Sequence, residues 1–358
     1  MSIVPLWVKS QVRVTGRLSP VAPKYLVWEC NPLGFLGESL TQLVDRVQWI
    51  NDLLGLCLVG VGFIRDAGNI VWPENLLSLE FGDDFDQSLY PFVWPETLKS
   101  LTFGEQFKSS LTETLLPSSL ERLILGKCFN APIVKVVFPR SLKTLVFGDF
   151  FNCELNGTTL PTNLETIVFG SYFNKPIDDV AWPESLKKVW FKSRTAGGFD
   201  QSLTKVEFPD SLEDLDLGGS FSGPIDCVRW RGLKRLKLGA SFSSPIDEVE
   251  WSSSLEDLDL GDDFNHPPVN LPKSLLTLSL GVGANTPILD VVWPDSLREI
   301  TFGRSFDQPI VGVRWPKNIR SLVFASNYRH DVTSTECQTF TLSASALSKS
   351  LLDQCFLT

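Results

Sequence analysis

One phrase repeats along most of this chain and constrains its fold more than any other feature. The phrase is Leu-x-x-Leu-x-Phe-Gly-x-x-Phe-Asn-x-Pro-Ile-x-x-Val-x-Trp-Pro-x-Ser-Leu, and its glycine slot returns about every 22 residues. The slot is filled in turn by Gly60, Gly82, Gly104, Gly126, Gly148, Gly170, Lys192, Gly218, Gly239, Gly261, Gly281, Gly303 and Ala325. A fixed period of this length is typical of a solenoid, in which each coil buries its apolar face against its neighbours. We therefore expect one repeat body of about 12–13 coils over residues 50–330.

The apolar pattern within a coil predicts β structure. In Leu142–Gly148, Leu145 and Phe147 alternate with Val146, which places one face of a strand inward. A second alternating segment ends in Trp182 or its equivalent, followed by proline. The sequence therefore predicts a mostly β solenoid with two parallel strand columns.

Two aromatic columns are expected to run through the coils. A phenylalanine follows the glycine turn in most coils, and only Ala284 clearly interrupts this series. A tryptophan or phenylalanine recurs before the proline, for example at Trp182 and Phe208. We attribute the glycines to turns with positive φ, and the Asn or Asp after the phenylalanine to a local side-chain-bonded turn.

Charge and cysteine content limit the classes of partner and compartment. The formal net charge of −10 argues against nucleic acid and anionic membranes as partners, and favours proteins with basic patches. The seven cysteines have no paired spacing, which favours reduced thiols in the cytoplasm. Met1–Val14 lacks the pattern of a secretory signal, and Leu53–Ile64 is too short to span a bilayer.

The repeat resembles the FNIP repeat, a leucine-rich-repeat relative with a Phe-Asn-Ile-Pro signature. The signature is recognised in Phe129–Ile133, Phe173–Ile177 and Phe306–Ile310, and Trp-Pro-x-Ser-Leu is kept at Trp182–Leu186 and Trp293–Leu297. The resemblance covers residues of about 50–325 and implies a leucine-rich-repeat-like β-solenoid. It also implies an interaction platform, which in some members accompanies an F-box or a kinase domain.

The two ends of the chain are expected to cap the solenoid, because an open end would expose unpaired strand edges. Residues 1–49 contain neither kinase motifs nor a convincing F-box, and short strands are predicted at Gln11–Val14 and Tyr25–Trp28. In the tail, residues 331–358, apolar residues fall four apart at Leu347, Leu351 and Cys355. This spacing predicts a short C-terminal capping helix.

No set of residues indicates catalysis, and we predict no catalytic, cofactor-binding or metal-binding residues. Of the two histidines, His266 fits a surface turn and His330 a linker after the last coil. No Cys/His spacing suits zinc, and Gly281–Gly283 lies inside the repeat rather than in a phosphate loop. The sequence therefore predicts that the protein is not an enzyme.

The candidate partner-binding site lies where the repeat varies or breaks. Four consecutive outward strand slots are apolar, and the next glycine interval is 26 residues long, which places an inserted loop at 193–198. Insertions in repeats form loops that are often on the binding face. The alternative for the apolar slots is β-branched preference on a half-covered strand. The predicted contacts are Ile124, Val146, Val168 and Trp190 with the basic residues Lys187, Lys188 and Arg194.

Charges alternate in sign over the following coils. Lys187 and Lys188 precede Glu213, Asp214 and Asp216, then Lys234, Arg235 and Lys237, then Glu256, Asp257 and Asp259. Neighbouring coils would then face each other with opposite charge, forming ion-pair ladders. The alternative is an electrostatic docking face for a partner.

These observations favour a non-catalytic protein–protein interaction module, monomeric unless it is part of an assembly. One alternative is a structural subunit of a larger multiprotein assembly. A second alternative is the substrate-recognition component of a ubiquitin ligase that lacks a recognisable F-box.

Overall fold

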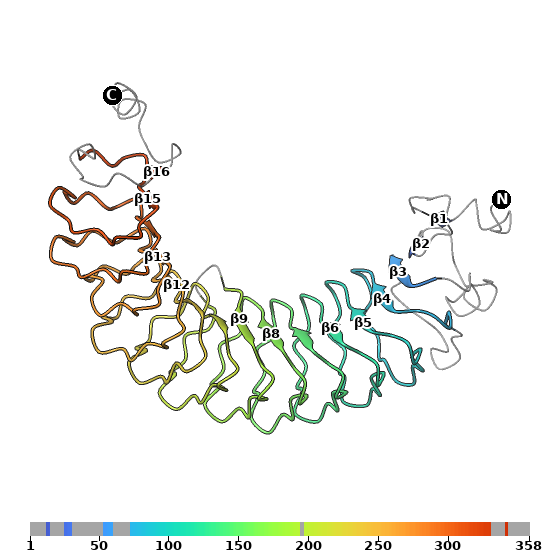
Figure 1. The fold of residues 1–358 in the computed structure, drawn as a ribbon. Helices are drawn as coiled ribbons and strands as arrows, with labels where there is room; N and C mark the ends of the chain where they lie inside the picture. The colour runs from blue at the N-terminus through green and yellow to red at the C-terminus, as the bar shows by residue number, and fades with distance from the viewer. Residues whose placement is uncertain are drawn as a thin grey trace. The chain divides into compact units, whose positions relative to one another are not determined.

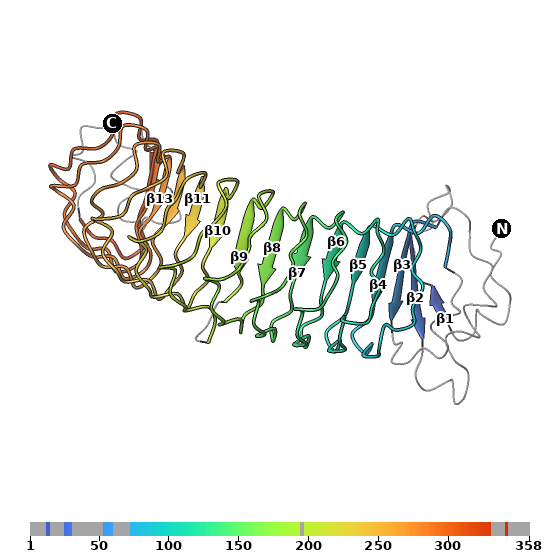
Figure 2. The ribbon, with the colours of Figure 1, turned by 90° about the horizontal axis from the view of Figure 1, so that it is seen from below.

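The computed structural model describes residues 12–14, 25–30, 53–59, 72–193, 197–330 and 341–342. Strands are the only regular secondary structure in these ranges, and each coil contributes one (Figures 1 and 2). The chain divides into a first unit, Met1–Phe173, and a second unit, Asn174–Thr358. The predicted capping helix lies outside the described residues.

In the first unit, eight strands follow one another in sequence order. They are β1 (Val12–Val14), β2 (Tyr25–Cys30), β3 (Gly55–Val59), β4 (Ser78–Phe81), β5 (Ser100–Thr102), β6 (Arg122–Ile124), β7 (Thr144–Val146) and β8 (Thr166–Phe169). Strand β1 pairs antiparallel with β2, and from β2 onward each strand pairs in parallel with the next. The strands expected near Gln11–Val14 and Tyr25–Trp28 thus correspond to β1 and β2.

The second unit repeats this arrangement with parallel strands alone. They are β9 (Lys188–Phe191), β10 (Asp214–Asp216), β11 (Arg235–Lys237), β12 (Asp257–Asp259), β13 (Thr277–Ser279), β14 (Glu299–Thr301), β15 (Ser321–Val323) and β16 (Thr341–Leu342). Each of them pairs in register with the next.

The second strand column is not formed in the described residues, which corrects that detail of the prediction. The Val-x-Trp-Pro segments assume no regular secondary structure there. Proline has no N–H to donate to a sheet, and the chain turns directly after it. In the turn after Trp182, the amide of Leu186 donates to the carbonyl of Pro183 at 3.0 Å.

The core consists of the inward strand residues and the phenylalanine column. The central inward residue of each strand from β4 to β15 is at most 2% exposed. Phe85, Phe107, Phe129 and Phe151 are fully buried, and their ring centroids stack 6.0–6.1 Å apart in successive coils. Hydrogen-bonded strands lie about 4.8 Å apart. In this unit neighbouring coils are therefore further apart at the phenylalanine column than at the sheet. The unit curves so that the strand face lies on its concave side.

The phenylalanine column continues in the second unit with two exceptions. Ala284 fills the predicted gap and is 4% exposed. Tyr328 extends the column one coil further than we predicted, because its ring stacks 5.8 Å from that of Phe306. Its hydroxyl donates to the carbonyl of Gln308 at 2.9 Å. The signal was present in the sequence, since Tyr328 lies one 22-residue period after Phe306.

The glycine slot is required chiefly by close packing between coils. A Cβ at Gly126 would lie 1.8 Å from the carbonyl oxygen of Gly104, so no other residue fits without a shift of the backbone. The positive φ that we expected occurs at Gly239, where φ is 88°, but not at Gly126. Contact between backbones, rather than turn geometry alone, explains why the slot is glycine.

In several coils the serine of Trp-Pro-x-Ser-Leu is hydrogen-bonded to carbonyl groups of the preceding coil. The hydroxyl of Ser141 lies 2.8 Å from the carbonyl oxygen of Ser118 and 2.7 Å from that of Leu120. Ser296 makes the same pair of contacts in the second unit, at 2.7 Å to Lys273 and 2.7 Å to Leu275. This part of the repeat therefore satisfies backbone carbonyls that form no sheet.

The Asn or Asp after the phenylalanine also links neighbouring coils, instead of closing the local turn that we predicted. Asn130 Oδ1 accepts a hydrogen bond from the backbone N–H of Asn152 at 2.9 Å. Asn285 Oδ1 accepts one from Asp307 at 2.9 Å. The side chain thus replaces a backbone partner where the coils are too far apart to pair directly.

Removing one ring from the column tests its contribution to stability. Phe129→Ala is expected to lower the free energy of unfolding by about 3–5 kcal/mol, because it removes a fully buried ring with stacked neighbours on both sides. Denaturant titration followed by circular dichroism measures this loss. Val137→Ala, at a side chain that is 76% exposed, is the control and should change stability by less than about 0.5 kcal/mol. Similar losses in the two variants would contradict the assignment.

Candidate interaction surface

The strand face of the first unit carries the apolar part of the predicted site. Ile124, Val146 and Val168 lie in register on β6, β7 and β8, as the repeat indicates. Ile124 and Val146 are half-buried, whereas Val168 is only 4% exposed. We expected these three side chains to form an exposed apolar stripe, but they are less exposed than predicted. Side chains on neighbouring parallel strands lie close enough to shield one another.

Trp190 of β9, in the second unit, does not stand free as the exposed anchor that we expected. Its side chain is half-buried, and its indole Nε1 donates to Asp214 Oδ1 at 2.9 Å. The ammonium of Lys188 lies 5.4 Å from the centre of the indole ring, within the range of a cation–π contact. The structure therefore brings Lys188 and Trp190 together and fixes the orientation of the ring.

Asp214 connects three neighbouring strands. It is 7% exposed and lies in register with Lys188 on one side and Arg235 on the other. Arg235 donates to Asp214 Oδ2 through Nη2 at 2.7 Å and through Nε at 3.1 Å. The carboxylate thus accepts from an indole and a guanidinium, which compensates its burial. Sequence reasoning placed Asp214 in a charge ladder but missed its bond to Trp190.

The inserted loop is anchored at both of its described ends. The hydroxyl of Ser220 lies 3.1 Å from that of Ser193 and accepts from the N–H of Gly198 at 3.0 Å. Gly197 has a φ of 109°, a conformation that favours glycine. Arg194, which we predicted as a contact residue, lies outside the described residues. Lys187 is exposed and directly precedes β9, so it lies at the end of the strand opposite to the loop.

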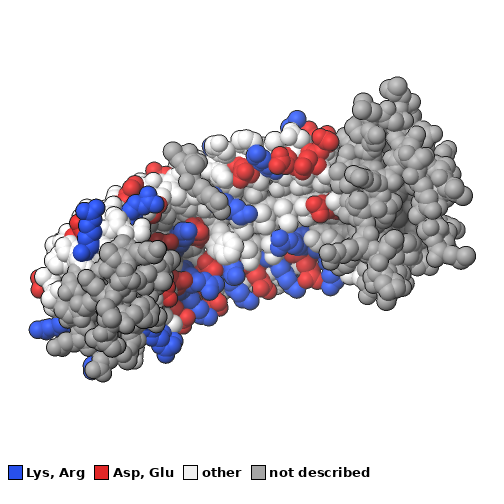
Figure 3. Space-filling view, turned by 90° about the horizontal axis from the view of Figure 1, so that it is seen from above, with Lys and Arg blue, Asp and Glu red and all other residues white. Residues whose placement is uncertain are grey.

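The predicted ion-pair ladder is present between β10 and β11. Lys234 Nζ lies 3.3 Å from Glu213, beside the Arg235–Asp214 pair. The first unit has a ladder that we did not predict, in which Glu121 pairs with Lys99 and Lys143 at 3.0 Å each. Figure 3 shows side chains of both signs interleaved along one margin of the viewed face, beside a band of uncharged residues.

Asp216 and Asp259 flank Lys237 in register on the strand face. Burial raises the pKa of both carboxyl groups above the usual range for aspartate. The amide N–H groups of Gly218 and Gly261 and the charge of Lys237 oppose this rise. Burial therefore opposes the ionisation of both aspartates.

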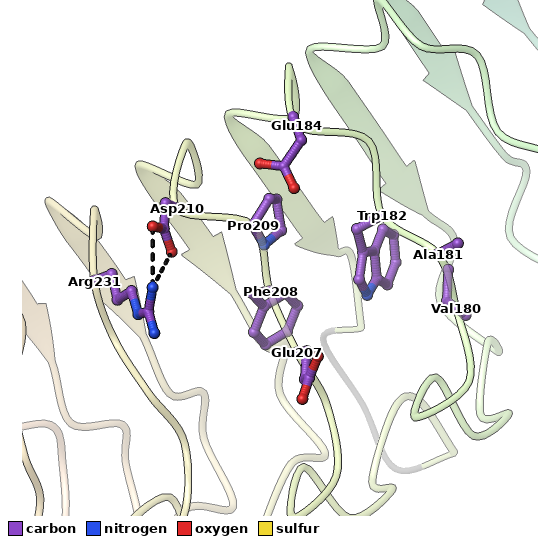
Figure 4. A pocket seen from close by; sticks show the side chains of 9 residues that line it. All are labelled: Val180, Ala181, Trp182, Glu184, Glu207, Phe208, Pro209, Asp210 and Arg231. Carbon is purple, nitrogen blue, oxygen red and sulfur yellow. Dashed lines mark hydrogen bonds and ion pairs between the residues drawn. The ribbon is translucent and has the colours of Figure 1, made fainter.

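A hollow of about 400 Å³ opens where the coil with the inserted loop meets its neighbours (Figure 4). It is lined by Val180, Ala181, Trp182, Glu184, Glu207, Phe208, Pro209, Asp210 and Arg231. Trp182 is 8% exposed, and its ring centre lies 6.1 Å from that of Phe208. Arg231 Nη1 donates to Asp210 at 3.2 and 3.3 Å.

The two histidines occupy the same slot of different coils. His266 Nε2 lies 2.8 Å from the carbonyl oxygen of Ser243, and His330 Nε2 lies 2.8 Å from that of Asp307. His330 also lies 3.3 Å from the carboxylate of Asp307, so its interpretation as a linker residue was wrong. Both rings support contacts between coils.

Two structural findings bear on the other site predictions. Within the ranges that the structure describes, no group of three or more His, Cys, Asp and Glu residues is placed to hold a metal ion. The same ranges contain no helix long and apolar enough to cross a membrane.

The Trp190–Asp214–Arg235 network can be tested by truncating its carboxylate. Asp214→Ala is expected to lower the free energy of unfolding by about 1–3 kcal/mol, because two donors lose a partner at a nearly buried site. Asp210→Ala is the matched control, since Asp210 and Arg231 are 64% and 61% exposed. It should cost about 0–1 kcal/mol. Equal losses in urea titrations would argue against the network.

Because the pKa of Asp259 is raised in the folded protein, removing its charge is expected to stabilise the protein in a pH-dependent way. Between the unfolded and the folded pKa the folded chain binds more protons, so its stability falls as the pH rises through this range. Asp259→Asn should therefore stabilise the protein at neutral pH. The gain should disappear as the pH falls through the folded-state pKa of Asp259. Unfolding titrations across this range measure it.

Glu121→Gln is the control of opposite sign. The hydrogen bonds from Lys143 and Lys99 lower the pKa of Glu121, so its contribution to stability is present above the ordinary glutamate pKa. The variant should be less stable than the parent at neutral pH and lose this difference as the pH falls through the folded-state pKa. The same pH trend in both variants would contradict the assignment.

Comparisons with known proteins agree with this architecture. The family described as FNIP Repeat matches residues 71–106, 93–128, 107–150, 129–167 and 151–193. The circular LRR protein CroV588 is similar with a TM-score of 0.68 and 31% identity, over 82% of this chain and 46% of that chain. This chain therefore spans less than half the length of CroV588.

Internalin inlF of Listeria monocytogenes str. 4b F2365 is similar with a TM-score of 0.49 and 13% identity, over 80% of this chain and 86% of that chain. No curated protein matches the sequence significantly. The repeat pattern, the stacked parallel strands and the family match lead to one conclusion. The chain is a leucine-rich-repeat-like β-solenoid, and its residues 71–193 are FNIP repeats.

Proposed function

We propose that this chain is a non-catalytic module that binds a protein partner on its strand face. The fold is typical of protein–protein interaction modules. The observation that supports the proposal most is the contrast between the two faces of the sheet. The inward residue is apolar in every strand from β4 to β15, whereas the outward residues change from apolar to acidic or basic between coils.

The two units offer different chemistry to a partner. In the first unit the outward residues of β6 and β7 include half-buried Ile124 and Val146. In the second unit β9 to β11 present Lys188, Trp190 and the exposed cations Arg235 and Lys237, with Asp216 between them. A partner with apolar side chains would suit the first surface, and one with charges of both signs would suit the second.

The proposed contact residues are those that the sequence indicated, but the structure changes how much each of them is expected to contribute. Ile124 and Val146 are the apolar contacts of the first unit, and Val168 contributes less because it is covered. In the second unit Lys187 and Lys188 would contact the partner directly. Trp190 presents a ring whose orientation Asp214 fixes, which reduces the entropy lost on binding. Arg194, which lies outside the described residues, stays a predicted contact.

Replacing the apolar contacts without changing charge tests the strand face. The variant Ile124→Gln/Val146→Gln should recover at least fivefold less partner than the parent chain in quantitative co-purification. Apolar contacts at the centre of an interface supply most of its affinity. Mass spectrometry with isotope-labelled samples measures the recovery of each co-purifying protein.

The matched control is Val137→Gln, because Val137 is 76% exposed and lies outside the strands. It should recover the same proteins as the parent. The melting temperature of each variant is recorded so that loss of folding is separated from loss of binding. Unchanged recovery with the strand-face variant, or equal loss with the control, would overturn the proposal.

A further inference from the structure

One asparagine of the first unit is followed directly by glycine. Asn156-Gly157 is the only Asn-Gly pair in the sequence, and both residues are exposed. Gly157 has a φ of 75°, a conformation that residues with a side chain rarely adopt. A Cβ at this position would also lie 3.3 Å from Cγ2 of Val134 in the preceding coil. The turn therefore requires glycine after this asparagine.

The turn leaves the side chain of Asn156 and the N–H of Gly157 free to react with each other. The N–H of Thr158 donates to the carbonyl of Leu155 at 2.9 Å, which closes the turn across Asn156 and Gly157. This bond uses neither of the two groups. Among the described residues, the side-chain amide of Asn156 and the N–H of Gly157 have no hydrogen-bond partner. The fold therefore holds neither group away from the other.

The other described asparagines take part in interactions, most often between coils. Asn130 and Asn285 accept hydrogen bonds from the backbone of the following coil. Asn163 is exposed, but its Nδ2 donates to the carbonyl of Arg140 at 3.0 Å. Each of these three asparagines precedes a residue larger than glycine, whose side chain hinders the approach of its own amide nitrogen. Asn156 therefore differs from them in both its sequence and its contacts.

The chemistry of this pair is an intramolecular acyl transfer. The backbone nitrogen of Gly157 loses its proton and attacks Cγ of Asn156, which closes a succinimide ring. The bond between Cγ and Nδ2 breaks, and Nδ2 leaves as ammonia after taking up a proton through solvent. Water then adds to one carbonyl carbon of the ring and breaks its bond to nitrogen. The products are aspartate or isoaspartate, and the reaction consumes only water.

We propose that Asn156 is a site of spontaneous deamidation in the folded protein. Each conversion adds a negative charge to a chain whose formal net charge is −10. Isoaspartate also places the former side-chain methylene in the backbone between Leu155 and Thr158. The bond that closes the turn then loses its geometry. Leu155 is 1% exposed and Thr158 is 7% exposed, so the change reaches the interior of the coil. This site is independent of the proposed strand-face interaction.

Peptide mapping of the aged full chain tests the reaction. The chain is incubated at neutral and at mildly alkaline pH, digested at acidic pH to stop the reaction, and analysed by mass spectrometry. Replacement of the amide by a hydroxyl should accumulate at Asn156 at least tenfold faster than at Asn163, the exposed control. The rate should rise with pH, because the attacking nitrogen must lose its proton.

Two references separate the effect of the fold from that of the sequence. The synthetic peptide Glu-Leu-Asn-Gly-Thr-Thr-Leu, which copies residues 154–160, gives the rate without the turn. The folded chain should react within tenfold of this rate. Asn156→Ser has no side-chain amide at this position and should lose the acidic species that the parent forms on anion exchange. Its melting temperature should match that of the parent, because the side chain is exposed.

The structural consequence is measured on the isoaspartate form separated by anion exchange. It should melt at a lower temperature than fresh Asn156→Asp, which has the same charge and a normal backbone. Equal melting of the two would overturn the predicted opening of the turn. A rate in the folded chain more than tenfold below that of the peptide, or no greater than that of Asn163, would overturn the site itself.

Discussion

The stacking of one coil on the next is the constraint on which the rest of the structure depends. A single coil has one short strand and, in most coils, a phenylalanine after the glycine slot, and neither can be covered within the coil itself. Phe129 is buried because the rings of Phe107 and Phe151 lie about 6.0 Å away on either side. Every other feature of the repeat brings the coils close enough for this contact. The glycine slot shows it most directly, since the carbonyl of Gly104 occupies the space that a Cβ at Gly126 would need.

The polar residues of the repeat signature serve the stacking of the coils rather than the binding of a partner. Ser141 donates to the preceding coil, and Asn130 accepts from the following one, so their polar groups are occupied by backbone. The histidines do the same, because His266 and His330 contact carbonyls of the preceding coil. Under the proposed function, recognition therefore falls to residues that the repeat leaves variable, chiefly the outward residues of the strands.

The sequence predicted much of the fold and part of the candidate site. The strands, the phenylalanine column and the charge ladder of Glu213, Lys234, Asp214 and Arg235 follow from residue spacing, because slot-equivalent residues of a solenoid become neighbours. The prediction of a second strand column was wrong, because alternating apolar residues before Trp182 also fit a stacked segment that has no sheet hydrogen bonds. The bond from Trp190 to Asp214 was missed because it joins different slots of neighbouring strands, and periodicity relates only equal slots.

By itself, the sequence determined the solenoid architecture, most residues of the phenylalanine column and the FNIP repeats of residues 71–193, because a period fixed over a dozen coils makes slot-equivalent residues neighbours. Only the tertiary structure decided how exposed each outward residue is. It showed Val168 covered, Trp190 oriented by Asp214, and a hollow between the coils of Trp182 and Phe208. The physical reason is that exposure and ring tilt depend on distances between coils. Those distances are set by the sum of the packing contacts around a side chain, which spacing along the chain does not specify.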